Sequence, residues 1–145
     1  MCRFQENYCR ILLRKKITEA VVLMGHFAEY GEGKYRVWAD LIPAGEDFVV
    51  FIGGGEKPHI GSMSICEKGG EAFSVSMPEH KDYIVSSEAA KRIAELTGRR
   101  CLVVVGIHVE GATKLEIKKL LKNASKCIEL IMVKPLDSKP IGLKG

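Results

Sequence analysis

Apolar and polar side chains alternate along several short stretches, the pattern of strands with one covered face. Residues 35–42 alternate in this way, and residues 48–52 are apolar at every position, which predicts a buried strand. The segments 30–34 and 43–47 are rich in glycine, proline and charge and are predicted to be turns. In the first of these strands the two faces are Tyr35, Val37, Ala39 and Leu41 on one side, and Trp38 and Ile42 on the other.

A hairpin is predicted over residues 60–77. Met63 and Ile65 alternate with serines in the first half, Phe73 and Val75 do so in the second, and a Lys-Gly-Gly turn joins the halves. Residues 17–30 fit a helix or a strand by pattern alone, and a strand is favoured.

The second half of the chain predicts helix, strand, helix, strand. Ser86 or Ser87 can cap a first helix that Gly98 ends. Residues 101–105 are wholly apolar, which predicts a central strand covered on both faces. Thr113 and Glu116 form a capping box for a second helix, and residues 127–133 predict a last strand.

This order of elements predicts an α+β fold: a mixed, largely antiparallel sheet covered by two main helices. The length of 145 residues fits one domain. We expect a basic N-terminal segment over residues 1–16, a single domain over residues 17–134 and a flexible tail over residues 135–145, which contains two prolines and little to bury.

The positive charge gathers at the N-terminus. The formal net charge is +4, and residues 1–16 carry five Arg or Lys against one Glu, so the remainder of the chain is neutral. A neutral folded body argues against a nucleic-acid binder. No apolar run has the ~20 residues of a membrane span, and no secretory signal pattern is present, so we expect a cytoplasmic protein.

The five cysteines suggest neither a disulfide framework nor a zinc site, because they are odd in number and show no C-x-x-C pair. Cys66, Cys101 and Cys127 lie in apolar runs and are expected to be small buried hydrophobic residues. Burial raises a thiol pKa, which opposes a role as nucleophile.

Candidate chemistry lies in three segments that each follow a predicted strand and contain a histidine: residues 53–61, 78–82 and 106–111. His59, His80 and His108 could line one pocket. Successive glycines can direct backbone N–H groups toward a phosphate, and lysines would add charge. The candidate anion-binding residues are Gly53, Gly54, Gly55, Lys57, Pro58, His59, Gly61, His80, Lys81 and His108.

Two other interpretations stay open. The glycines can serve a bulge or a tight bend that Pro58 stiffens. Alternatively, His59, His80 and His108 could hold a catalytic metal, since three imidazoles suffice for zinc with an open position. The histidines would otherwise be hydrogen-bonded in turns or lie at a dimer interface, and His26 is expected to be structural.

The succession AGEDFVVFIGGGEKPHIGSMSI, then PEHKDY, then VVVGIHVEGATKLEI resembles the small LpdD-like proteins, described as prenylated flavin chaperone-like. The resemblance covers about residues 35–133. It implies a fold similar to that of proteasome assembly chaperones and an accessory role beside UbiD-type hydroxyarylic acid decarboxylases.

The resemblance implies a non-enzymatic, homodimeric accessory protein that would hold or deliver prenylated FMN or help to assemble a decarboxylase client. The Pro58 to Gly61 motif, His80 with Lys81, and His108 would then form the site. The competing hypotheses are a metal-dependent enzyme that uses the three histidines and a structural dimer whose loops form the interface.

Overall fold

The structure, a computed structural model, describes residues 26–79 and 81–133. In chain order its elements are β1 (His26–Tyr30), the 3-10 turn η1 (Gly33–Tyr35), β2 (Val37–Ala44), β3 (Asp47–Gly55), β4 (Ser62–Cys66), β5 (Phe73–Ser76), α2 (Tyr83–Thr97), β6 (Cys101–His108) and α3 (Lys114–Val133). The predicted segments 1–16 and 135–145, and residues 17–25 of the predicted first strand, lie outside the described residues.

The strands form one six-stranded sheet in the order β1-β2-β3-β6-β4-β5. Only β3 and β6 run parallel, while the other neighbours are antiparallel. The predicted α+β class with a mixed, largely antiparallel sheet and two helices is therefore confirmed for the described residues. The predicted hairpin is confirmed as β4 and β5.

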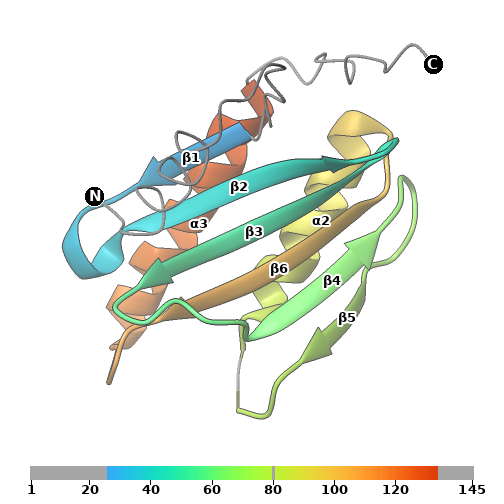
Figure 1. Ribbon diagram of the computed structural model, residues 1–145. Helices are drawn as coiled ribbons and strands as arrows, with labels where there is room; N and C mark the ends of the chain where they lie inside the picture. Colours follow the sequence, from blue (N-terminus) through green and yellow to red (C-terminus); the bar gives the residue numbers. More distant parts are fainter. Residues whose placement is uncertain (1–25, 80, 134–145) are drawn as a thin grey trace, which may run out of the picture.

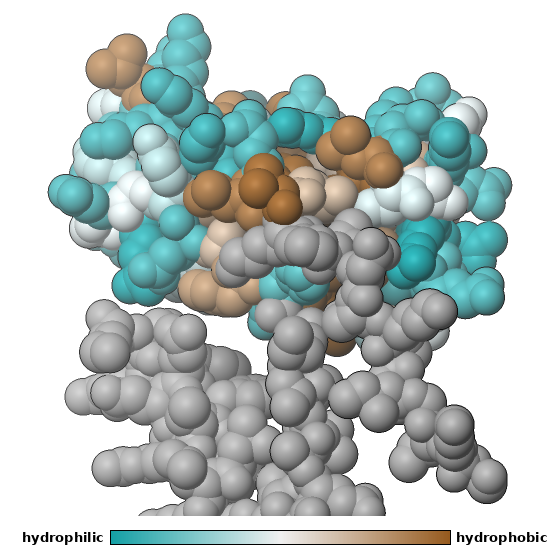
Figure 2. All heavy atoms as spheres, turned by 90° about the horizontal axis from the view of Figure 1, so that it is seen from above, coloured by the Kyte–Doolittle hydropathy of each residue, from teal (hydrophilic) through white to brown (hydrophobic). Residues whose placement is uncertain are grey.

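Both helices lie behind the sheet in Figure 1, where α2 packs on β4 and β6 and α3 packs on β1 and β2. Alternate strand residues point into this layer and form the core, such as Val37, Ala39 and Leu41 of β2, which are fully buried. Viewed from above, apolar residues gather in the middle of the surface, with hydrophilic residues on either side (Figure 2).

The opposite face of the sheet carries no described helix. On this side Phe51, Leu102 and Val104 are only half-buried. The predicted central place of residues 101–105 is confirmed, because β6 lies between β3 and β4, but the predicted cover on both faces is wrong for the described residues. An apolar run shows that both faces avoid charge, and it does not show what covers them.

The predicted last strand at residues 127–133 is wrong, because α3 continues through it to Val133. Cys127, Ile128 and Ile131 continue the helical spacing of the buried residues Leu120 and Ala124, and no glycine or proline interrupts the helix. A short run of β-branched and apolar residues cannot by itself distinguish a strand from the last turns of a buried helix.

The first helix begins earlier than predicted. Its N-cap is Asp82, and Ser86 lies inside α2 with a fully buried side chain. The Ser86 hydroxyl donates to the Tyr83 carbonyl and accepts from Ser62, so it serves packing instead of capping. Gly98 ends the helix in the left-handed conformation, as predicted, and its N–H donates to the Ala94 carbonyl.

Candidate functional site

The parallel pair β3 and β6 brings two of the predicted histidine segments to one corner of the sheet. Gly55, the last residue of β3, lies opposite His108, the last residue of β6. From this point the chain must pass the end of β6, because β4 lies on the far side of it. Residues 56–61 make that crossing (Figure 1), and the main chain of His59 lies against Gly106 of β6.

The imidazoles of His59 and His108 meet at this corner. Their ring centroids are 5.7 Å apart, with an interplanar angle of 76°, which is an edge-to-face contact. His59 Nδ1 lies 3.1 Å from the Lys57 carbonyl oxygen, and His108 Nε2 lies 3.3 Å from Glu110 Oε2. His59 is exposed and His108 is half-buried, so both rings can be reached from solvent.

The glycines serve close packing of the backbone. Gly53 and Gly54 belong to β3, where a Cβ would meet the Trp38 ring and the main chain of β2 respectively. Gly106 lies directly beneath the His59 carbonyl, so any side chain there would collide with the crossing segment. The interpretation of residues 53–61 as one irregular rim is thus wrong at its start, and residues 106–108 likewise belong to β6.

Four backbone amides near this corner already have acceptors. The N–H groups of Glu56 and Lys57 both donate to the His108 carbonyl, and the Gly61 N–H donates to the Val105 carbonyl at 2.8 Å. The Gly55 N–H donates to the Arg36 carbonyl. These four N–H groups are used in the fold, so they are not available to an anion, and side chains would have to supply donors in their place.

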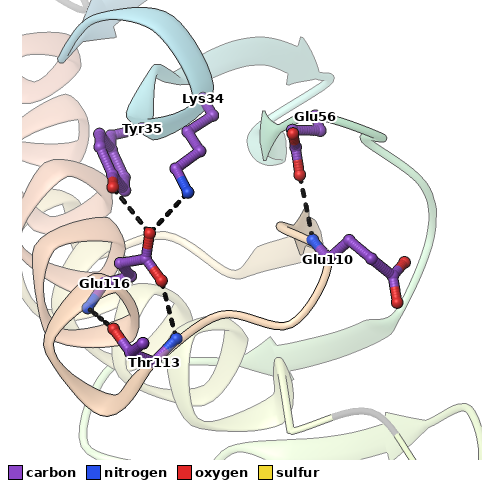
Figure 3. Close-up of polar contacts among 6 residues, drawn as sticks. All are labelled: Lys34, Tyr35, Glu56, Glu110, Thr113 and Glu116. Atoms are coloured by element: carbon purple, nitrogen blue, oxygen red, sulfur yellow. Dashed lines mark hydrogen bonds and ion pairs between the residues drawn. The ribbon is translucent and has the colours of Figure 1, made fainter.

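The remaining predicted residues differ in their exposure. Lys57, Pro58 and Lys81 are exposed, Gly61 is buried beside the Asp82 carboxylate, and His80 lies outside the described residues. Two carboxylates also border the corner, since Glu56 Oε2 accepts from the Glu110 N–H at 3.1 Å (Figure 3). A phosphate at this place would compete with Glu110 for His108.

A second polar cluster holds η1 against the start of α3 (Figure 3). Glu116 Oε1 accepts from the Tyr35 hydroxyl at 2.8 Å and pairs with the Lys34 ammonium at 2.6 Å. The predicted capping box is confirmed: the Thr113 N–H donates to Glu116 and the Glu116 N–H donates to the Thr113 hydroxyl. The hydrogen bond from Lys34, with the bonds from Thr113 and Tyr35, lowers the pKa of Glu116 to about 2.

The sequence pattern did not indicate the roles of Tyr35, Lys34 and Gly106. Tyr35 and Lys34 lie far along the chain from Glu116, and only the packing of η1 on α3 brings them together. Gly106 lies in the Gly-Ile-His motif, so the sequence indicated that a glycine is needed there. The sequence did not indicate that the residue packed against it is His59 of the crossing segment.

Residues 31–135 match the family described as "Prenylated flavin chaperone LpdD-like domain". The chain belongs to this family. A curated relative, Protein LpdD of Lactiplantibacillus plantarum, is 33% identical over 88 residues, which are 57% of this chain and 65% of the relative. The LpdD-like chain thus spans a little less than two thirds of the length of that relative. The match supports a chaperone or accessory role.

The described cysteines of this LpdD-like chain are buried, as predicted, although Cys127 lies on a helix. Burial raises the pKa of the Cys101 thiol to about 12 and that of Cys127 to about 11, and it also raises the pKa of Cys66. Thiols with pKa values of about 12 and about 11 hold almost no thiolate at neutral pH, so Cys101 and Cys127 are poor nucleophiles, and burial also disfavours the thiolate of Cys66.

The described residues contain no group of three His, Cys, Asp or Glu side chains placed to hold a metal ion. Of the three-histidine arrangement, the structure brings His59 and His108 together, and His80 falls outside its described ranges. Within those ranges, no helix has the length and apolar character that crossing a bilayer requires.

Proposed function

We propose that this chain is a non-enzymatic accessory protein that binds a phosphate-bearing flavin of the prenylated FMN type and assists a UbiD-type decarboxylase. The observation that carries the proposal is the contact between His59 and His108 at the carboxyl ends of two parallel strands. Ligands of sheets with parallel strands commonly bind at this edge. The family match supports the flavin class of ligand.

In this proposal different side chains bind the phosphate and the flavin ring. His59, His108 and Lys57 supply donors for the phosphate, because four backbone N–H groups at this corner are used in the fold. Lys81, on the segment before α2, and His80 would complete the positive side of the site. Ile60, which is 67% exposed, offers an apolar contact beside the rings for a flavin.

The remaining parts of the proposal concern the setting. The chain would act in the cytoplasm as a homodimer and would carry out no reaction of its own. The described cysteines support a role without nucleophilic catalysis, because burial raises their thiol pKa values. The decarboxylase subunit would be the client that receives or retains the flavin.

The test is a fluorescence titration of the full chain with FMN and with prenylated FMN under anaerobic conditions. Loss of one charge-assisted hydrogen bond should weaken binding about tenfold, so His59→Ala and His108→Ala should each show that loss. Glu110→Gln should strengthen binding, because it removes the carboxylate that competes for His108. His26→Gln, on the distant edge strand β1, is the matched control and should bind normally.

Two results together would reject the proposal. The first is that the fluorescence of neither flavin changes when the wild-type chain is added, and the second is that a co-expressed decarboxylase subunit does not co-purify with the chain. If the His59 and His108 variants bind the flavin as tightly as the wild-type chain, the proposed site is rejected, although the proposed ligand is retained.

A further inference from the structure

The sheet face opposite the helices, called here the outer face, is built from two rows of side chains that cross all the central strands. Register places the members of each row directly opposite one another. The first row is Ile42, Val49, Leu102, Ile65 and Phe73, and the second row is Phe27, Asp40, Phe51, Val104, Met63 and Val75.

The outer face is apolar and open among the described residues. Met63, Ile65 and Val75 are 43%, 39% and 45% exposed, and Phe73 is 72% exposed. Over the same two strands the serines face the helices, where Ser62 and Ser64 are buried. The hairpin therefore turns its apolar side away from the core. In a sheet with one covered face, the apolar side usually faces the core and the polar side faces solvent. A contiguous patch of this kind marks an interaction surface.

The size of the outer face suits a stable association. Six strands at about 4.8 Å spacing span ~24 Å, and the side-chain rows lie about 7 Å apart along each strand. Counted as two rows about 7 Å wide each, the outer face has a flat footprint of ~340 Å², because the next row is covered where the His59 main chain crosses Gly106. Side-chain relief increases the accessible area toward the ~800 Å² that each partner buries in an interface of standard size.

The charge of the outer face indicates the kind of partner. Asp40 is the single charged residue of the two rows, and in the next row Glu29 pairs with Arg36 of the same chain. An apolar, nearly uncharged, regularly pleated surface is complementary to another sheet of the same kind. A second copy of this chain presents such a sheet.

We propose that the outer face is the contact surface between two copies of this chain, which pack sheet on sheet with their helices outside. This inference rests on the homodimer in the proposed function and adds the location of its interface. The outer faces would form the middle of a four-layer arrangement in which each sheet is covered on both sides.

Asp40 distinguishes this partner from a basic one. The two rows of a second copy bring no Lys or Arg, and the neighbouring Arg36 pairs with Glu29, so the carboxylate would lose water and gain no cation from them. Burial already raises the pKa of Asp40 in the single chain. Asp40→Asn should therefore strengthen the association. If the basic segment 1–16 or a basic client covered this face instead, the same substitution would weaken binding.

Sedimentation of the full chain tests the proposal. The wild-type chain should be a dimer in the micromolar range, and Met63→Glu or Val75→Glu should weaken dimerisation at least tenfold by burying a charge. Leu115→Glu is the matched control: this α3 side chain is 79% exposed on the opposite layer, and its variant should remain a dimer. Phe73→Glu, at an edge strand, provides a third variant that the monomer fold should tolerate, as its melting temperature will show.

A wild-type chain that is monomeric at about 100 µM, where an interface of standard size should hold, would overturn the proposal. So would a dimer that all three outer-face variants leave intact, or a weaker dimer in Asp40→Asn. A dimer that persists through another surface would keep the homodimer and reject this interface, and the flavin titration gives its result independently of both.

Discussion

The Tyr35 hydroxyl donates a 2.8 Å hydrogen bond to Glu116, which ties the turn before β2 to the first turn of α3. The same carboxylate pairs with Lys34 and closes the capping box with Thr113. One side chain thus fixes the start of α3 against the turn that leads into the sheet. The loop that carries Glu110, beside His108, leads directly into this cluster (Figure 3).

Glu116 should make stability depend on acid pH. Its pKa in the folded chain is about 2, below the ordinary 4.5, so its contribution is complete above about pH 4.5 and disappears as the pH falls toward 2. Glu116→Gln should lower the melting temperature at pH 7 and approach the wild type near pH 2. Thermal melts across this range measure it, with Glu46→Gln in the exposed β2 to β3 turn as control. An equal deficit at every pH would contradict the assignment.

Gly106→Ala should destabilise the chain. The new methyl group would meet the main chain of His59, which cannot rotate away, and such overpacking costs about 1 to 3 kcal/mol. Chemical denaturation measures the loss. Gly70→Ala is the comparison and should cost less, because its added Cβ would lie 3.2 Å from the Glu67 carbonyl oxygen, a tight contact that a shift of a few tenths of an ångström relieves, and the glycine has an ordinary backbone conformation. The substitution at Gly106 should also disturb the His59 ring and so weaken flavin binding.

The buried serines should matter more than their small size suggests. Ser86→Ala removes the acceptor of the 3.0 Å bond from Ser62, and an unsatisfied buried hydroxyl costs about 1 to 3 kcal/mol. Ser64 keeps a second partner in Ser74, so the loss should come chiefly from Ser62. Denaturant unfolding of Ser86→Ala and of its half-buried neighbour Ser87→Ala compares the two positions, and similar stabilities would show that the serine cluster contributes nothing.

The described thiols should resist alkylation in the native chain. The pKa values of about 12 for Cys101 and about 11 for Cys127 leave almost no thiolate at pH 8. A variant with Cys2 and Cys9 changed to Ser isolates Cys66, Cys101 and Cys127. Mass spectrometry after maleimide treatment should find no modification in buffer and full modification in denaturant. Rapid native labelling of Cys101 would show that β6 opens.

Local patterns predicted most of the sheet correctly, because period-two alternation depends only on neighbours along the chain. The alternation of Val37, Ala39 and Leu41 with Trp38 correctly separated the two faces of β2. The same reasoning failed at residues 127–133, where an apolar run suits either a strand or the end of a buried helix. Packing against β1 and β2 favours the helix, and the local sequence of one segment does not show which other segments it packs against.

The sequence by itself determined the α+β class, the capping box of Thr113 and Glu116, the stop at Gly98 and the buried character of the described cysteines. Each depends on side chains close together in the chain. Only the tertiary structure decided that His59 and His108 meet, that the glycines admit a crossing backbone, and that the apolar side of β4 and β5 faces away from the helices. These depend on the parallel pairing of β3 with β6 and on the insertion of β6 between β3 and β4, contacts between distant segments that local spacing does not encode.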